Sequence, residues 1–171
     1  DPTYRKNLWN YGKKGKDILL ELVSLSNIFI GGVNEINEIL GTQFPLDKKG
    51  FIDGCRLLID TCPYINKIFD KVRNEGNSSR QIVQGRCWSG KEYFETSNIE
   101  ITHVVDRIGT GDAFAAGIIF GLQKYGGIRE TLEFATAAFA IKHTIAGDVN
   151  LASEEEIIEI MNGNFHGKIN R

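Results

Sequence analysis

Two glycines and a carboxylate stand together in the segment DRIGTGDAFAAG, residues 106–117. The alternating apolar residues before this segment predict a strand, and the small apolar residues after it favour a helix. In a parallel α/β sheet, ligands bind where strands end and helices begin. Gly109 and Gly111 have no side chains that would hold an anion away from the backbone N–H groups of the helix start. Residues 109–112 could therefore form an anion hole.

Asp112 adds a negative charge to this predicted anion hole, where it would repel a bound phosphate. A carboxylate at this place has a use if it accepts a proton from a substrate hydroxyl that attacks phosphorus. The alternative is that Asp112 or Thr110 simply caps the helix. The spacing of these residues alone favours the helix cap.

The hydrophobic pattern predicts the elements that position this turn. Within the segment 50–72, Pro63 is expected to start a second helix or a turn. Further along the chain, Ser153 and Glu156 form a capping box, which is typical of a helix start. Strands are expected at 27–32, 80–88, 92–96 and 99–105, and helices at 15–26, 34–40, 50–72, 112–125, 127–145 and 153–161. Alternating strands and helices predict an α/β layered domain with a largely parallel sheet.

Composition narrows the class of protein. The 171 residues suffice for one domain with a core, and the formal net charge of −2 gives no basic excess for binding nucleic acid or an anionic membrane. The three cysteines form no CxxC pair, which suits reduced thiols in a cytoplasm. No signal peptide and no apolar run long enough to span a membrane is evident.

The segment 106–117 closely resembles the signature D-x-x-G-x-G-D-x-F-x-x-G of the ribokinase-like (PfkB) sugar kinases. This resemblance implies that Asp112 is the catalytic base and that Gly109, Thr110 and Gly111 supply the N–H groups that bind the phosphates of ATP. Thr110 stands where alanine or glycine is commoner, which leaves its backbone N–H unchanged. The implied fold is ribokinase-like, that is, Rossmann-like, with its β lid absent.

Two further stretches are similar to the 2-keto-3-deoxygluconate kinase branch of that family. DPTYRKNLW, residues 1–9, resembles D-x-N-Y-R-x-x-L-W, with Thr3 in place of the asparagine. Arg5 would then bind the carboxylate of a sugar acid, and its alternative role is that of a solvated surface residue. The segments 100–122 and 141–153 are also similar to this branch.

A second motif of the family, N-x-x-E, is linked to Mg²⁺ and phosphate, and residues 31–38 match it only in part. Asn34 is followed by Asn37 at the acidic position, while Glu35 and Glu38 keep two acids shifted by one residue. Asn34, Glu35 and Glu38 are therefore the candidates for an indirect role in binding Mg²⁺. The alternative is an ordinary acidic first turn of a helix.

The segment 135–148 resembles the helix and loop that border adenine in the family. The resemblance places Thr136 near the base, Gly147 in the loop that faces the G-x-G-D turn, and Asp148 near the sugar acid. It also implies ATP and Mg²⁺ as cofactors, with a monovalent cation as a further candidate.

A near match to a phosphate-binding loop, GRCWSGKE at 85–92, has Glu92 where a Mg²⁺-binding hydroxyl belongs and is followed by a strand pattern. We interpret it as a hairpin turn. His103 and His143 lack metal-ligand spacing and are expected to have structural roles.

These observations predict the C-terminal part, residues 1–171, of a single PfkB-type domain. The expected enzyme phosphorylates 2-keto-3-deoxygluconate on its primary hydroxyl, acts on a sugar acid and ATP, and is a homo-oligomer at full length. Another sugar kinase of the family, such as fructokinase or ribokinase, and a non-catalytic nucleotide-binding or assembly module are the alternatives. Because family members are about twice as long, these residues alone are expected to be inactive and to expose a sheet edge or an apolar face.

Overall fold

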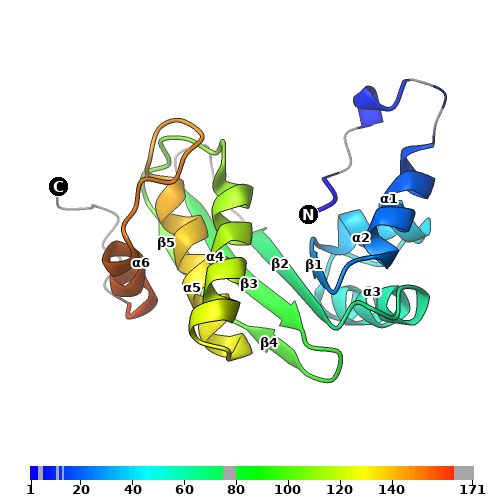
Figure 1. Cartoon of the computed structure of the whole chain (residues 1–171). Helices are drawn as coiled ribbons and strands as arrows, with labels where there is room; N and C mark the ends of the chain where they lie inside the picture. Colours follow the sequence, from blue (N-terminus) through cyan, green and yellow to red (C-terminus); the bar gives the residue numbers. More distant parts are fainter. Residues whose placement is uncertain (4–5, 11, 13, 75–79, 164–171) are drawn as a thin grey trace. The chain divides into compact units, whose positions relative to one another are not determined.

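The computed structural model forms two compact units, and three strands have residues in both of them. The first unit comprises Asp1–Asp70 with Cys87–Tyr93, and the second comprises Lys71–Arg86 with Phe94–Arg171. Among the described residues, the strands follow the order β1-β2-β3-β4, and β5 pairs with β3 (Figure 1). The structure describes residues 1–3, 6–10, 12, 14–74 and 80–163.

The first unit packs three α-helices around a short parallel strand pair. Its elements are a 3₁₀ helix at Lys6–Leu8, α1 at Gly15–Ser24, β1 at Ile28–Ile30, α2 at Val33–Leu40, α3 at Lys48–Thr61 and the first half of β2, Lys67–Asn74. In the parallel ladder, Phe29 of β1 stands opposite Ile68 of β2. Both side chains are buried with Ile36, Phe51 and Leu58 in the core of this unit.

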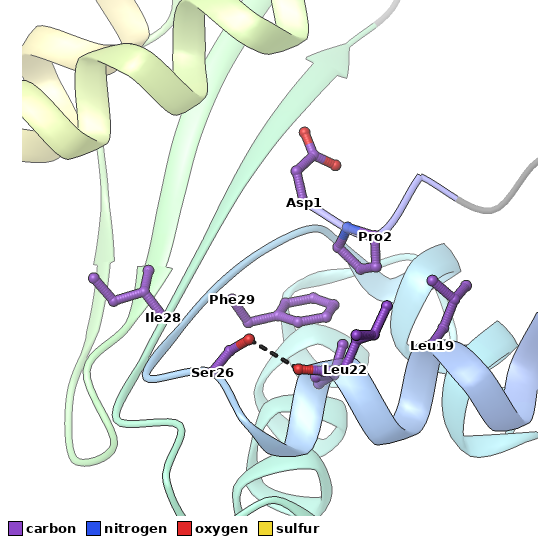
Figure 2. A pocket seen from close by; sticks show the side chains of 8 residues that line it. Asp1, Pro2, Leu19, Leu22, Ser26, Ile28 and Phe29 are labelled. Carbon is purple, nitrogen blue, oxygen red and sulfur yellow. Dashed lines mark hydrogen bonds between the residues drawn. The ribbon is translucent and has the colours of Figure 1, made fainter.

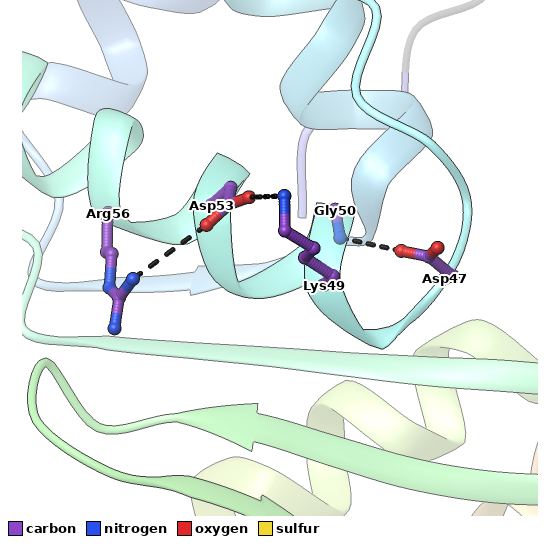
Figure 3. A network of polar contacts seen from close by, with 5 residues as sticks. All are labelled: Asp47, Lys49, Gly50, Asp53 and Arg56. Atoms are coloured by element: carbon purple, nitrogen blue, oxygen red, sulfur yellow. Dashed lines mark hydrogen bonds and ion pairs between the residues drawn. The ribbon is translucent and has the colours of Figure 1, made fainter.

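Helix α3 begins at a side-chain cap. The backbone N–H of Gly50 donates to Asp47 Oδ1 over 2.7 Å (Figure 3). One turn further on, Asp53 forms ion pairs with Lys49 at 3.1 Å and with Arg56 at 3.8 Å. Such surface pairs are worth only about 0–1 kcal/mol each, so the cap rather than the ion pairs fixes where α3 starts.

Helix α3 ends at Thr61, and Pro63 lies in the turn that follows it. The prediction that a helix continues to residue 72 is wrong, because the chain after this turn forms strand β2. Ile65, Ile68 and Phe69 are each at most 1% exposed. A strand that is covered on both faces carries a continuous apolar run, and a run this short cannot be told from a buried helix by its periodicity.

The second unit places two long helices beside the antiparallel part of the sheet (Figure 1). Its elements are the second half of β2, the larger parts of β3 at Gln81–Trp88 and β4 at Tyr93–Glu95, β5 at Ile99–Ile101, α4 at Thr110–Lys124, α5 at Ile128–Lys142 and α6 at Glu154–Met161. β3 and β5 run antiparallel, with Val83 opposite Ile99. The sheet is thus mixed rather than largely parallel, because no helical crossover separates β3, β4 and β5.

Helices α4 and α5 approach each other closely at two glycines of α4. A Cβ placed on Gly117 would lie 2.7 Å from the Cα of Ala135, and one on Gly121 would lie 2.9 Å from the Cα of Thr131. The two backbones therefore pack without intervening side chains at these points. This close packing fixes α4, whose first turn carries the predicted anion hole, against α5.

The expected sheet edge and apolar surface are both present in the first unit. β1 ends the strand order, and Leu22, Leu25 and Ile28 are exposed. Cys55, Cys62 and Cys87 are buried and form no disulfide with one another, and burial raises the pKa of Cys87 to about 12. In the described part of the chain, no helix is long and apolar enough to cross a membrane.

Candidate active site

The G-x-G-D turn begins helix α4 with a left-handed residue. Gly109 precedes the helix at φ +72°, a conformation that L side chains rarely adopt. Just before it, Asp106 accepts hydrogen bonds from the N–H groups of Ile108 at 3.0 Å and Gly147 at 2.9 Å. These two bonds, that of Ile108 first, lower the pKa of Asp106. The Asp106 carboxylate thus ties the turn to the loop that follows α5.

The loop after α5 lies directly on the turn. A Cβ on Gly109 would overlap the backbone carbonyl oxygen of Asp148 and would lie 2.7 Å from Asp148 Oδ1. The completely buried side chain of Lys142 supports this loop, because its ammonium donates to the Ile145 carbonyl over 2.9 Å. The structure therefore brings Gly147 and Asp148 beside the turn.

Asp112 lies in the first turn of α4 with an exposed side chain. In the part of the chain that the structure describes, its carboxylate makes no hydrogen bond and no ion pair. The Thr110 hydroxyl is instead buried and donates to the Arg107 carbonyl over 2.9 Å. Neither side chain accepts a hydrogen bond from the described backbone of α4, so the helix cap considered as the alternative is not formed. Asp112 is left accessible at the positive end of a helix.

Two basic residues that the sequence analysis missed face this turn from β2. Arg73 Nη2 donates to Thr110 Oγ1 over 2.8 Å, and Lys71 Cε lies 3.3 Å from the place where a Cβ on Gly111 would stand. The sequence contained one indication of this pair. Lys71 and Arg73 are separated by one residue, and alternate residues of a strand lie on the same face. This alternation was hidden because Lys71 fell in the helix predicted over 50–72, whereas Arg73 fell outside every predicted element.

Thr136 does not lie at an exposed position. Its side chain is completely buried, its hydroxyl donates to the Leu132 carbonyl over 2.7 Å, and it packs against Gly85 of β3. A side chain with no exposed surface offers nothing to a bound nucleotide. The geometry gives no support to the predicted contact between Thr136 and a nucleotide base.

The three residues of the partial N-x-x-E motif lie on α2 in the first unit. Glu35 caps its own helix, because its carboxylate accepts from the Gly32 N–H over 2.9 Å, while Asn34 and Glu38 are exposed. Glu35 is thus engaged as an acidic first-turn residue. Among the described residues, no group of three or more His, Cys, Asp or Glu could hold a metal ion. The proposed Mg²⁺ role of this motif has no geometric support, and we assign no chemical step to a metal.

The other sequence predictions concern residues outside the turn. Arg5 lies outside the described residues.

A pocket of about 170 Å³ in the first unit is lined by Asp1, Pro2 and mostly apolar side chains of α1 and β1 (Figure 2). Ser26, which also lines this pocket, donates its hydroxyl hydrogen to the Leu22 carbonyl. Residues 89–92 connect the neighbouring strands β3 and β4, as expected of a hairpin turn.

Comparisons with known proteins agree with this geometry. Residues 1–153 match the model of the pfkB family carbohydrate kinases, so the chain belongs to this family. An ATP-dependent 6-phosphofructokinase of Thermoanaerobacterium thermosaccharolyticum is 27% identical over 147 residues, which are 84% of this chain and 40% of that enzyme.

Two solved structures share the fold. A PfkB family carbohydrate kinase from Listeria grayi has a TM-score of 0.81 at 27% identity, and a 2-dehydro-3-deoxygluconokinase from Thermotoga maritima has a TM-score of 0.82 at 24% identity. Each superposition covers 94% of this chain and 48% of the other. The fold is therefore ribokinase-like, and the chain spans half or less of the length of these relatives.

Proposed function

We propose that the protein is an ATP-dependent sugar kinase in which Asp112 is the general base. Asp112 would take the proton of a sugar hydroxyl while that oxygen attacks the γ-phosphorus of ATP, and the bond to the ADP oxygen breaks. The N–H groups of residues 109–111 would stabilise the negative charge of the transferring phosphoryl group. Family membership and the geometry of the turn support this proposal.

The observation that carries the proposal is the state of the Asp112 carboxylate. It is exposed in the first turn of a helix whose N-terminal side chains form no cap, and it has no partner among the described residues. A carboxylate whose only role was structural would be expected to accept a backbone N–H at this place. One that receives a proton from a substrate must remain accessible.

The proposed substrate is 2-keto-3-deoxygluconate, phosphorylated on its primary hydroxyl. The stretch at residues 1–9 supports a sugar acid, because Arg5 could bind its carboxylate with two parallel hydrogen bonds. Asp148, which lies on the turn, is close enough to Gly109 to contact a substrate bound there. The second candidate is another sugar kinase of the family, and the similarity to a 6-phosphofructokinase favours a sugar phosphate for this alternative.

The test is a phosphorylation assay with ATP and a panel of sugars, in the full-length protein and its Asp112→Asn variant. The panel contains 2-keto-3-deoxygluconate, fructose, ribose and fructose 6-phosphate. We expect Asp112→Asn to lower kcat by on the order of 10²–10⁴-fold. Asp17 is the matched control, since it is an exposed acid in the first turn of α1, and Asp17→Asn should keep the wild-type rate.

The outcomes separate the alternatives. Preference for the sugar acid, lost in Arg5→Ala, would support the proposed substrate, whereas an equal loss on neutral sugars would give Arg5 a structural role. An Asp112→Asn variant as fast as wild type would contradict the general-base mechanism. A protein that binds ATP but phosphorylates no sugar would favour the non-catalytic nucleotide-binding module.

A further inference from the structure

Strand β2 presents two positive charges to the first turn of α4. Lys71 and Arg73 are alternate residues of the strand and so lie on one face. Lys71 Nζ lies 5.8 Å from the centroid of the Phe114 ring in α4, and its Cε lies 3.3 Å from where a Cβ on Gly111 would stand. Because residue 111 is glycine, the Lys71 side chain can lie close to the turn without a tight contact.

The Arg73 guanidinium is held in place at two points. Nη2 donates to Thr110 Oγ1 over 2.8 Å, and Cζ lies 5.0 Å from the centroid of the Phe139 ring in α5. A guanidinium has five N–H donors in a fixed plane, and Thr110 occupies one of them. The residue as a whole is exposed, so further donors can reach a ligand in solvent.

Several positive groups lie near the Arg73 guanidinium. The positive end of α4 and the charge of Lys71 face the same turn, and Arg107 is close enough to act on Arg73. Loss of hydration and then the Arg107 charge lower the pKa of Arg73. Of the acids at this turn, Asp106 is bonded to two backbone N–H groups, and Asp112 is assigned the substrate proton in the proposed function. Lys71, Arg73 and the positive end of α4 then form a collection of positive groups beside the turn. Such a collection is stabilised when an anion binds to it.

We infer that Arg73, assisted by Lys71, binds the terminal phosphate of the nucleotide opposite the backbone N–H groups of the G-x-G-D turn. This inference rests on the proposed function for the identity of the anion. The planar guanidinium would donate two parallel hydrogen bonds to phosphate oxygens, and the more mobile ammonium would act as a point charge. Thr110 would orient the guanidinium, which gives a use to the hydroxyl at a position where the family more often has alanine or glycine.

The experiment measures ligand binding by isothermal titration calorimetry on the full-length protein. The ligands are ATP, adenosine, inorganic phosphate and fructose 6-phosphate, and the variants are Arg73→Gln, Arg73→Lys and Lys71→Met. We expect Arg73→Gln to weaken ATP binding by about tenfold or more and to change adenosine binding by less than about twofold. Arg73→Lys should lie between Arg73→Gln and wild type, since it keeps the charge and loses the paired donors.

Arg129 provides the matched control. It lies in the first turn of α5 with its guanidinium 5.7 Å from the centroid of the Phe94 ring, so Arg129→Gln removes a similar stacked cation elsewhere. ATP binding by Arg129→Gln should equal that of wild type. Thermal melts identify variants that do not fold, and if Arg73→Gln is one of them, Arg73→Lys decides the question.

Three results would overturn the inference: unchanged ATP affinity in a folded Arg73 variant, equal loss of adenosine and ATP binding, or a loss confined to fructose 6-phosphate. The last result would assign the site to the phosphate of a sugar substrate. Failure of the proposed function is a different result, because a protein without kinase activity could still bind ATP in an Arg73-dependent way. An active, Asp112-dependent kinase that is indifferent to Arg73 would reject this inference alone.

Discussion

The backbone carbonyl oxygen of Asp148 occupies the space where a side chain on Gly109 would begin. This contact joins the first turn of α4 to the loop after α5, and it explains why the turn needs glycine for two separate reasons. The backbone is left-handed at φ +72°, and there is no room for a Cβ. The candidate base Asp112 follows three residues later, so its position depends on this contact.

Gly109→Ala should therefore destabilise the protein and lower its activity together. The left-handed conformation alone costs about 1–2 kcal/mol for an alanine, and the overlap with Asp148 adds to this cost. Gly126 is the control, since it has φ +69° and a Cβ added there would meet no atom within 4 Å. Chemical denaturation should show a larger loss for Gly109→Ala than for Gly126→Ala, and equal losses would mean that the contact with Asp148 is unimportant.

The close approach of α4 and α5 predicts the sign of the stability change when Gly117 is replaced by alanine. Replacing a helical glycine with alanine ordinarily stabilises a helix by about 1 kcal/mol. At Gly117 the added methyl would lie 2.7 Å from the Cα of Ala135, so overpacking should outweigh this gain and destabilise the protein by about 1–3 kcal/mol. Exposed Ala116 on the same helix offers the comparison, because Ala116→Gly changes helix propensity alone. A Gly117→Ala variant with a raised melting temperature would contradict the packing.

The sequence predicted those elements whose first residues carry a clear start signal, such as a capping box or glycines. The capping box of Ser153 and Glu156 predicted the start of α6, and both of its hydrogen bonds are present. Helix α4 could be placed because glycines precede a run of small apolar residues. The strand after Pro63 was missed because the first half of β2 is buried, and a buried strand segment lacks the polar alternation that separates it from a helix.

The site was predictable only as far as its motif extends along the chain. Gly109, Gly111 and Asp112 could be assigned from one continuous segment, whereas the contact of Arg73 with Thr110 joins a strand and a helix that are distant in sequence. No local pattern encodes such a contact. Glu35 shows the opposite limit, since the sequence allowed either a metal role or a helix cap and only the geometry shows the bond to Gly32.

Glu35 and Glu38 allow those two roles to be separated by experiment. Removing the helix cap with Glu35→Ala should lower the free energy of unfolding by about 1 kcal/mol, because the Gly32 N–H loses its partner. Glu38→Ala removes an exposed acid of the same helix and should change stability by less than about 0.5 kcal/mol. Urea denaturation measures both values. If Glu35→Ala leaves stability unchanged and raises the Mg²⁺ concentration needed for activity, the metal role is correct instead.

His143 should make the protein sensitive to mild acid. It is completely buried, Nδ1 lies 2.7 Å from the Phe139 carbonyl oxygen, and Nε2 has no hydrogen-bond partner in the described structure. Burial lowers the pKa of His143 to about 4, and the charges of Arg73, Arg107 and Lys142 act in the same direction. In the unfolded chain the pKa is about 6.5, so the unfolded state binds the extra proton first as the pH falls. The stability due to neutral His143 is complete above pH 6.5 and is lost progressively toward pH 4, by at most about 3 kcal/mol.

The corresponding measurement is the free energy of unfolding from pH 7.5 to pH 4, in wild type and in His143→Gln. Glutamine has no titrating group, so the variant should be less stable at pH 7.5 and should lose less stability on acidification. His103, which is exposed, serves as the control, and His103→Gln should follow the wild-type pH dependence. Parallel curves for wild type and His143→Gln would show that carboxylates such as Asp106, with its lowered pKa, account for the acid sensitivity. In that case the pKa of His143 would be the same in the folded protein and in the unfolded chain.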